Sequence, residues 1–202
     1  LDGVARRSPR DGVSVAVSTA LTPTKRAEAV LGGELSEVAL KRYLHGLPGV
    51  DTVGAAARAG HFQSRSIKTE SKRWGLDTAI SMVDLTTLEG ADTPGKVRTL
   101  ADKAVKTDPR DASAPSVAAV CVYGDMVPHV IDALGDRHIR RDPTGVAVAA
   151  VATAFPSGRA SHRVKIADTE DAVAAGADEI DMVIDRGAFL SGRWGEVFDL
   201  IV

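Results

Sequence analysis

The stretch GADEIDMVID, residues 176–185, has the apolar character of a buried strand and yet carries four carboxylates. Because side chains alternate between the two faces of a strand, the apolar and acidic residues separate onto opposite sides. The apolar side consists of Ile180, Met182 and Ile184, and the other side consists of Glu179, Asp181, Val183 and Asp185. The apolar side suits a layer beneath helices. The acidic side must then face the interior of a barrel or the tip of a sheet.

These acids are not equivalent. A carboxylate in a protein interior is unfavourable unless it is paired or hydrogen-bonded, so most acids near a strand are expected at its exposed ends. We therefore place Asp178 and Glu179 in the loop before the strand and Asp185 beyond it. Asp181 lies inside the apolar run, and buried acids of this kind cluster at functional sites. Asp181 is our candidate for a functional acid.

A regular alternation of strands and helices surrounds this stretch and fills residues 78–202. Predicted strands lie at 78–88, within 116–125, within 145–158 and at 179–185, and predicted helices lie at 93–106, 126–134, 162–176 and 192–202. In the first helix, Thr93 is the expected N-cap and Pro94 the first helical residue. Strands rich in Val, Ala and Ile between amphipathic helices indicate an α/β fold with a covered parallel sheet.

Two architectures fit this alternation: a doubly wound open sheet, or a (β/α)8 TIM barrel of which the first four βα units are present. No GxGxxG or GxxxxGK[ST] motif stands at a strand–helix turn, so the strongest local signals for dinucleotide or P-loop binding are missing. Residues 1–77 have a looser, helical pattern. We predict that 1–77 form a partly helical N-terminal extension and that 78–202 form a second region of four strand–helix units, enough for half a barrel.

Composition limits the partners. The 202 residues include 25 Lys and Arg against 27 Asp and Glu, a formal charge of −2, which gives no electrostatic reason to expect nucleic acid or an anionic membrane. No apolar run reaches the roughly 18 residues of a membrane span. The single cysteine, Cys121, cannot form an internal disulfide, and a reducing, cytoplasmic location is predicted. The sequence does not settle the oligomeric state, and a homodimer is one candidate.

Two further residues near strand ends are candidates. Asp84 lies at the end of the first predicted strand, where a turn cap and a site role are equally reasonable. Cys121 lies toward the end of the second strand, where a small packing residue is the ordinary interpretation. The five histidines are scattered without the spacing of metal ligands, so neither a metal nor another cofactor is predicted.

Four segments together resemble the deoxyribose-phosphate aldolases. They are MVDLTTLEGADT at 82–93, AAVCVYGDMV at 118–127, VATAFPSGRAS at 151–161 and EDAVAAGADEIDMVI at 170–184. The run TESKRWGLDTAISMVDLTTL at 69–88 is similar to the long form of the family, which has an N-terminal extension, as in animal enzymes. The resemblance covers about residues 66–202, and the combination of motifs is far more specific than any one of them.

This resemblance implies a (β/α)8 barrel, of which residues 78–202 form the first half, and a lyase of nucleoside catabolism. The family cleaves the phosphosugar 2-deoxy-D-ribose 5-phosphate reversibly to acetaldehyde and D-glyceraldehyde 3-phosphate, through a lysine Schiff base and without a metal. Carried over by motif, Asp181 is the catalytic acid that moves protons beside the imine. Asp84 and Cys121 are substrate-binding residues that line the pocket, and Cys121 is not the nucleophile.

The family's Schiff-base lysine lies in a KTSTG motif that this sequence does not contain. Its eight lysines all fall in predicted helices or linkers, and Lys165 is expected to be solvated in a helix. We expect the chain to be part of a longer aldolase and to be inactive by itself. Two alternatives stay open: a short, non-catalytic relative that binds or interacts, and a different barrel enzyme that uses Asp181 as a base on an enolising phosphosugar.

Overall fold

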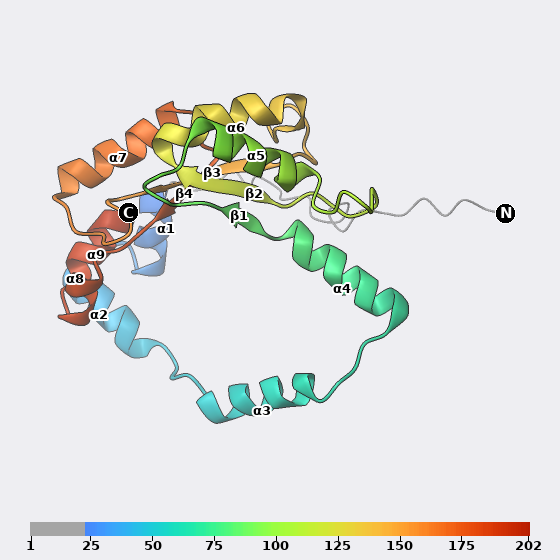
Figure 1. The fold of residues 1–202 in the computed structure, drawn as a ribbon. Helices are drawn as coiled ribbons and strands as arrows, with labels where there is room; N and C mark the ends of the chain where they lie inside the picture. The colour runs from blue at the N-terminus through green and yellow to red at the C-terminus, as the bar shows by residue number, and fades with distance from the viewer. Residues whose placement is uncertain (1–22) are drawn as a thin grey trace. The chain divides into compact units, whose positions relative to one another are not determined.

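The computed structural model describes residues 23–202 (Figure 1). Contacts divide the described residues into two units, one formed by Trp74–Asp185 and the other by residues 23–73 together with Arg186–Val202. Within the described residues, no helix combines the length and the apolar character needed to cross a membrane.

The first unit is built on a four-stranded parallel sheet. Its strands are β1 (Asp84–Thr86), β2 (Ala119–Tyr123), β3 (Ala147–Ala152) and β4 (Glu179–Met182), and they lie side by side in the order of the sequence. A doubly wound sheet reverses its strand order and has helices on both faces. This sheet winds in one direction only, as the strands of a (β/α)8 barrel do.

Each pair of neighbouring strands is connected through a helix. The connecting helices are α5 (Pro94–Val105), α6 (Val127–Leu134) and α7 (His162–Ala174), and a turn of 3-10 helix, η1 (Gly124–Met126), leads into α6. Figure 1 shows α5 and α6 on the same side of the sheet. Their apolar side chains form one core with those of the strands, and its buried members include Val97, Ala101, Val120, Val122, Val130, Leu134, Val148, Ala150 and Ala172.

Local sequence signals fix the ends of two of these helices. The Thr93 side chain accepts a hydrogen bond from the backbone N–H of Lys96, and Pro94 is the first helical residue of α5, as predicted. After α7 the chain turns at Gly176, whose φ is +104°. A Cβ at Gly176 would lie 2.8 Å from Cδ1 of Ile131, so both backbone conformation and space favour glycine there.

The first predicted strand is wrong in its extent. Residues 78–81 belong to a helix, α4 (Thr69–Ser81), and β1 covers three residues only. Asp84 is therefore the first residue of β1 and not a residue at its end. The apolar residues before Asp84 misled the strand prediction, since Ile80 reaches the core from the last turn of a helix.

The second unit is helical. It contains α1 (Pro23–Val30), α2 (Glu37–Gly46), α3 (Thr52–Gln63), α8 (Arg186–Leu190) and α9 (Trp194–Ile201). Helix α2 begins at a Ser36 N-cap and contacts α9. Residues 1–22 of the predicted extension lie outside the described residues, and the division of the chain at residue 77 stays a prediction.

Candidate active site

The face of the sheet opposite the helix-packed core, which we call the site face, collects the candidate residues. Strand alternation and register place on it Asp84, Thr86, Ala119, Cys121, Tyr123, Ala147, Ala149, Val151, Glu179 and Asp181. Its centre is a small buried cluster of Ala119, Cys121, Ala149 and Val151. Because the central side chains are small, the acids of the two outer strands, β1 and β4, interact electrostatically across the face.

Cys121 and Asp181 are in direct contact. The Cys121 thiol donates a hydrogen bond to Oδ2 of Asp181 over 3.2 Å, which joins β2 to β4 across 60 residues of sequence. Burial raises the pKa of the Cys121 thiol to about 12, and the hydrogen bond to Asp181 and the negative charges of Asp181 and Asp84 act in the same direction. A thiol in this environment stays protonated at neutral pH, so Cys121 lacks the properties of a nucleophile.

Asp84 and Glu179 complete an acidic cluster with Asp181. Burial raises the pKa of Asp84, and the negative charge of Asp181 raises it further. Burial also raises the pKa of Glu179, with additional contributions from Asp84 and Asp181. Like charges oppose one another's ionisation, and the neighbouring acids therefore add to the effect of burial on the pKa of Asp84 and of Glu179.

The structure thus brings together all three predicted site residues, and it adds one that sequence reasoning missed. Glu179 is predicted in the loop before the strand, but it is the first residue of β4 and pairs in register with Ala149. The alternation along the strand does place Glu179 on the same side as Asp181. The rarity of acids inside strands favours the loop when the sequence alone is considered.

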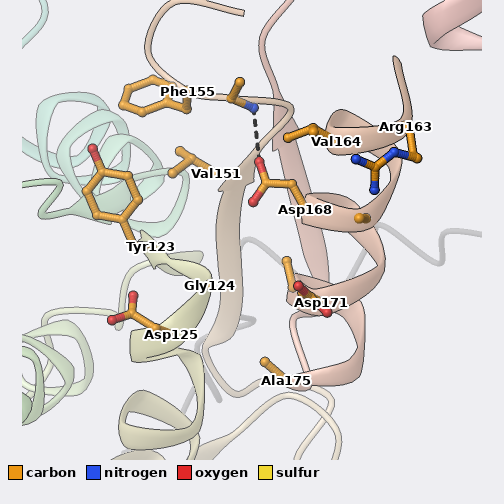
Figure 2. A pocket seen from close by; sticks show the side chains of 13 residues that line it. Tyr123, Gly124, Asp125, Val151, Phe155, Arg163, Val164, Asp168, Asp171 and Ala175 are labelled. Carbon is orange, nitrogen blue, oxygen red and sulfur yellow. Dashed lines mark hydrogen bonds between the residues drawn. The ribbon is translucent and has the colours of Figure 1, made fainter. Parts of the chain in front are cut away.

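The loop after β3 has an unusual backbone. Thr153 and Ala154 both have a φ of +63°, in the left-handed region that residues other than glycine rarely adopt, at roughly 1–3 kcal/mol each. The Thr153 hydroxyl donates to the Val183 carbonyl over 2.8 Å and accepts the Val183 N–H over 2.7 Å. The N–H of Ala154 donates to Oδ2 of Asp168 over 2.9 Å (Figure 2).

A pocket of about 750 Å³ opens at the carboxyl ends of β2 and β3, beside α7 (Figure 2). Tyr123, Val151 and Phe155 line it, and the Tyr123 and Phe155 rings meet edge to face with centroids 6.2 Å apart. The size is within the range of small-molecule sites, and the position agrees with the end of a barrel at which active sites lie. Its charged lining residues are Asp125, Arg163, Asp168 and Asp171.

A second polar cluster lies at the amino end of β4 and is structural. The Asp178 carboxylate accepts hydrogen bonds from Nε2 of His138 over 2.7 Å, from Nε of Arg140 over 2.5 Å and from the Val148 N–H over 2.9 Å. Burial by itself would raise the pKa of Asp178, but these hydrogen bonds lower it below its ordinary value. Asp178 precedes the strand as predicted, and its side chain is only 12% exposed. Polar residues at this end of a barrel serve stability.

No lysine completes the site face. All eight lysines of the sequence lie in helices or in the segments that flank them. Lys165 corrects an expectation, because it is 5% exposed on α7 and not solvated. The long aliphatic stem of a lysine can be buried while its ammonium group stays near water. Within residues 23–202, no group of three or more His, Cys, Asp or Glu side chains is arranged to hold a metal ion.

No family model matches the chain, but the curated proteins that resemble it include several with the same name. The mouse deoxyribose-phosphate aldolase is 35% identical over 159 residues, which are 74% of this chain and 48% of the mouse protein. The human deoxyribose-phosphate aldolase is 34% identical over 153 residues, which are 71% of this chain and 46% of the human protein. The chain therefore spans about half the length of these curated relatives.

Solved structures agree on the fold. A crystal structure from Coccidioides immitis, assigned as a deoxyribose-phosphate aldolase, has a TM-score of 0.51 and 25% identity, and the match covers 62% of this chain and 43% of that one. A structure from Toxoplasma gondii with the same assignment has a TM-score of 0.51 and 22% identity, covers 65% of this chain and 45% of that one, and supports the fold alone. The chain is thus a homologue of the deoxyribose-phosphate aldolases, and its four-stranded sheet is part of a (β/α)8 barrel.

Proposed function

We propose that this chain supplies the proton-transfer side of a class I aldolase site, which cleaves 2-deoxy-D-ribose 5-phosphate to acetaldehyde and D-glyceraldehyde 3-phosphate. The observation that carries the proposal is the pairing of Asp181 with Cys121 on the site face, in a homologue of proteins that bear this enzyme's name. Asp181 lies near the carboxyl end of β4, where the catalytic groups of barrel enzymes are found.

Aldol cleavage through an imine needs a proton-transfer group beside the reacting carbon atoms. A lysine amine condenses with the sugar aldehyde to form a protonated imine, which accepts the electron pair released when the neighbouring carbon–carbon bond breaks. That bond breaks as a base removes the proton of the sugar hydroxyl. The oxygen of this hydroxyl becomes the aldehyde oxygen of glyceraldehyde 3-phosphate. The resulting enamine takes up a proton and is hydrolysed to acetaldehyde. Asp181 is the group that we assign to these proton transfers, directly or through one water.

The other acids of the cluster support the same assignment. Asp84 and Glu179 carry pKa values raised by burial and by neighbouring negative charge. A lysine ammonium or a protonated imine placed among these carboxylates would reverse that effect. We assign Asp84 to the substrate hydroxyls and Cys121 to the floor of the site face, where its protonated thiol orients the Asp181 carboxylate.

The imine-forming lysine is not assigned to this sequence, because every lysine lies outside the strands that form the site face. We therefore propose that a lysine elsewhere in the gene product completes the site and that the 202-residue chain alone has no aldolase turnover. A reducing, cytoplasmic location is part of the proposal and rests on the single cysteine.

Acetaldehyde release from deoxyribose 5-phosphate tests the proposal. The gene product that carries this sequence is compared with its Asp181→Asn variant and with Glu170→Gln, a charge-removing control on the exposed side of α7. We expect Asp181→Asn to lower kcat by about 10²–10⁴-fold, the range for loss of a proton-transfer group, and Glu170→Gln to leave it unchanged. Turnover by Asp181→Asn at the unmodified rate would refute the role of Asp181.

A further inference from the structure

The pairing of β3 with β4 continues past the ends of both strands through a side chain. The backbone ladder ends where Ala152 pairs with Met182. Thr153, the residue after β3, has its backbone in the left-handed region and no longer matches a neighbouring strand. Its hydroxyl takes over both roles of the missing backbone partner, because it donates to the Val183 carbonyl and accepts the Val183 N–H.

The identity of the residue supports a specific role for the hydroxyl. Glycine adopts a φ of +63° without strain, whereas a β-branched residue in this region is an outlier that persists only where its surroundings hold it. Thr153 is 4% exposed, so its two hydrogen bonds to Val183 are shielded from water. A threonine here therefore provides something that a glycine cannot, namely the bond to β4.

A second tether holds the same loop from the helix side. Asp168 of α7 accepts the N–H of Ala154, as the dashed line in Figure 2 shows. The loop then passes very close to the chain that follows β4, because a Cβ on Gly158 would lie 2.3 Å from the Ile184 carbonyl oxygen. The left-handed pair is thus fastened to β4 on one side and to α7 on the other.

From these contacts we propose that Thr153, supported by Asp168, is a positioning residue that holds the end of β4 and thereby keeps Asp181 against Cys121. Asp181 pairs with Val151 in the strand register, and Val183 lies two residues further along the chain. The ladder runs through Asp181 to Met182, and Thr153 holds the chain at Val183, the next residue. Asp181 also carries the 3.2 Å contact with Cys121, so a displacement of the end of β4 would lengthen this hydrogen bond. The inference rests on the proposed function only in naming Asp181 the proton carrier.

Two substitutions separate the hydroxyl from the bulk of the side chain. Thr153→Val keeps the shape and removes the hydroxyl, whereas Thr153→Ser keeps the hydroxyl and is less branched. In the 202-residue chain, Thr153→Val should speed hydrogen exchange at the Val183 amide by about 10-fold or more, since a partly buried N–H loses its acceptor. Exchange at the Val120 and Val148 amides in the core should stay unchanged. Thr153→Ser should return the Val183 amide to within about threefold of the parent rate.

The pH profile of Cys121 alkylation by iodoacetamide reports on Asp181. Loosening β4 weakens the hydrogen bond that helps to raise the Cys121 pKa, so Thr153→Val should move the profile to lower pH and Thr153→Ser should not. An unchanged exchange rate at the Val183 amide, together with an unchanged pH profile of Cys121 alkylation, would overturn the proposal if found in Thr153→Val. So would a Thr153→Ser protein that behaves like Thr153→Val.

Asp168 provides an independent test if Thr153→Val does not fold. Asp168→Ala should speed exchange at the Ala154 amide by a similar factor, and Asp168→Asn, which keeps an acceptor oxygen, should restore it. Equal exchange at Ala154 in the parent chain and in Asp168→Ala would overturn the proposal. None of these measurements requires turnover, so they can fail or succeed separately from the proposed aldolase function.

Discussion

Removal of the Asp178 carboxylate should destabilise the sheet unit more than any other loss of a single charge in it. In Asp178→Ala, the Val148 N–H loses its acceptor inside the core, which costs about 1–3 kcal/mol. The hydrogen bond from His138, whose side chain is 4% exposed, contributes about 1.5–3 kcal/mol because one partner is charged. Arg140 is 55% exposed and adds at most about 1 kcal/mol. We expect a loss of about 3–5 kcal/mol in the free energy of unfolding, the range for breaking a buried pair.

The pH dependence provides a second signature of the same cluster. The pKa of Asp178 is lowered in the folded state, so its contribution is present above the ordinary pKa of aspartate and is lost as the pH falls through the lowered value. The difference in stability between the parent chain and Asp178→Ala should therefore be largest near neutral pH and should shrink below about pH 4. Asp178→Asn keeps one acceptor oxygen, so its free energy of unfolding should lie between those of the parent chain and Asp178→Ala.

Urea unfolding followed by far-UV circular dichroism measures this effect, together with hydrogen exchange at core amides of the sheet unit, because the two units need not unfold together. Asp132→Ala is the matched control, since it removes an exposed aspartate whose 3.5 Å ion pair with Arg98 should contribute less than about 1 kcal/mol. A loss below about 1 kcal/mol in Asp178→Ala, or a difference that does not change with pH, would refute this account of the cluster.

Two further predictions concern the site face. Asp84→Asn and Glu179→Gln should each raise the urea midpoint at pH 7, because a carboxyl whose folded pKa is raised loses stability as the pH rises through that pKa; a lower midpoint in both variants would contradict the electrostatic account of the cluster. The pKa of Cys121 is raised from 9.0 to about 12, so at pH 8 it should react with iodoacetamide roughly 10³-fold more slowly in the folded chain than in urea. Similar rates in both states would show that the thiol is not held as described.

Sequence reasoning found the elements whose signals are local. The helix that begins after Thr93, the turn at Gly176 and the strands at β2 and β3 followed from capping, glycine and runs of valine and alanine. The first strand failed because an apolar segment looks the same whether it packs as a strand or as the end of a helix. At Ile80, tertiary packing decided the outcome.

The site divided in a similar way. Asp181 stood out because it interrupts an apolar run, whereas Glu179 at the strand's edge looked like an ordinary loop acid. The bond between Cys121 and Asp181 joins residues 60 positions apart and depends on the register of three strands. The two hydrogen bonds between Thr153 and Val183 depend on a left-handed backbone at residues that do not favour one, so no propensity rule predicts them.

Reductive trapping tests the central claim most directly. The gene product that carries this sequence is incubated with deoxyribose 5-phosphate and sodium borohydride, and the adduct is located by mass spectrometry of its peptides. We predict a covalent adduct on one lysine that is not among the eight in these 202 residues, and no adduct when the sugar is omitted. Full turnover without any trapped lysine, or an adduct on one of these eight, would contradict the account.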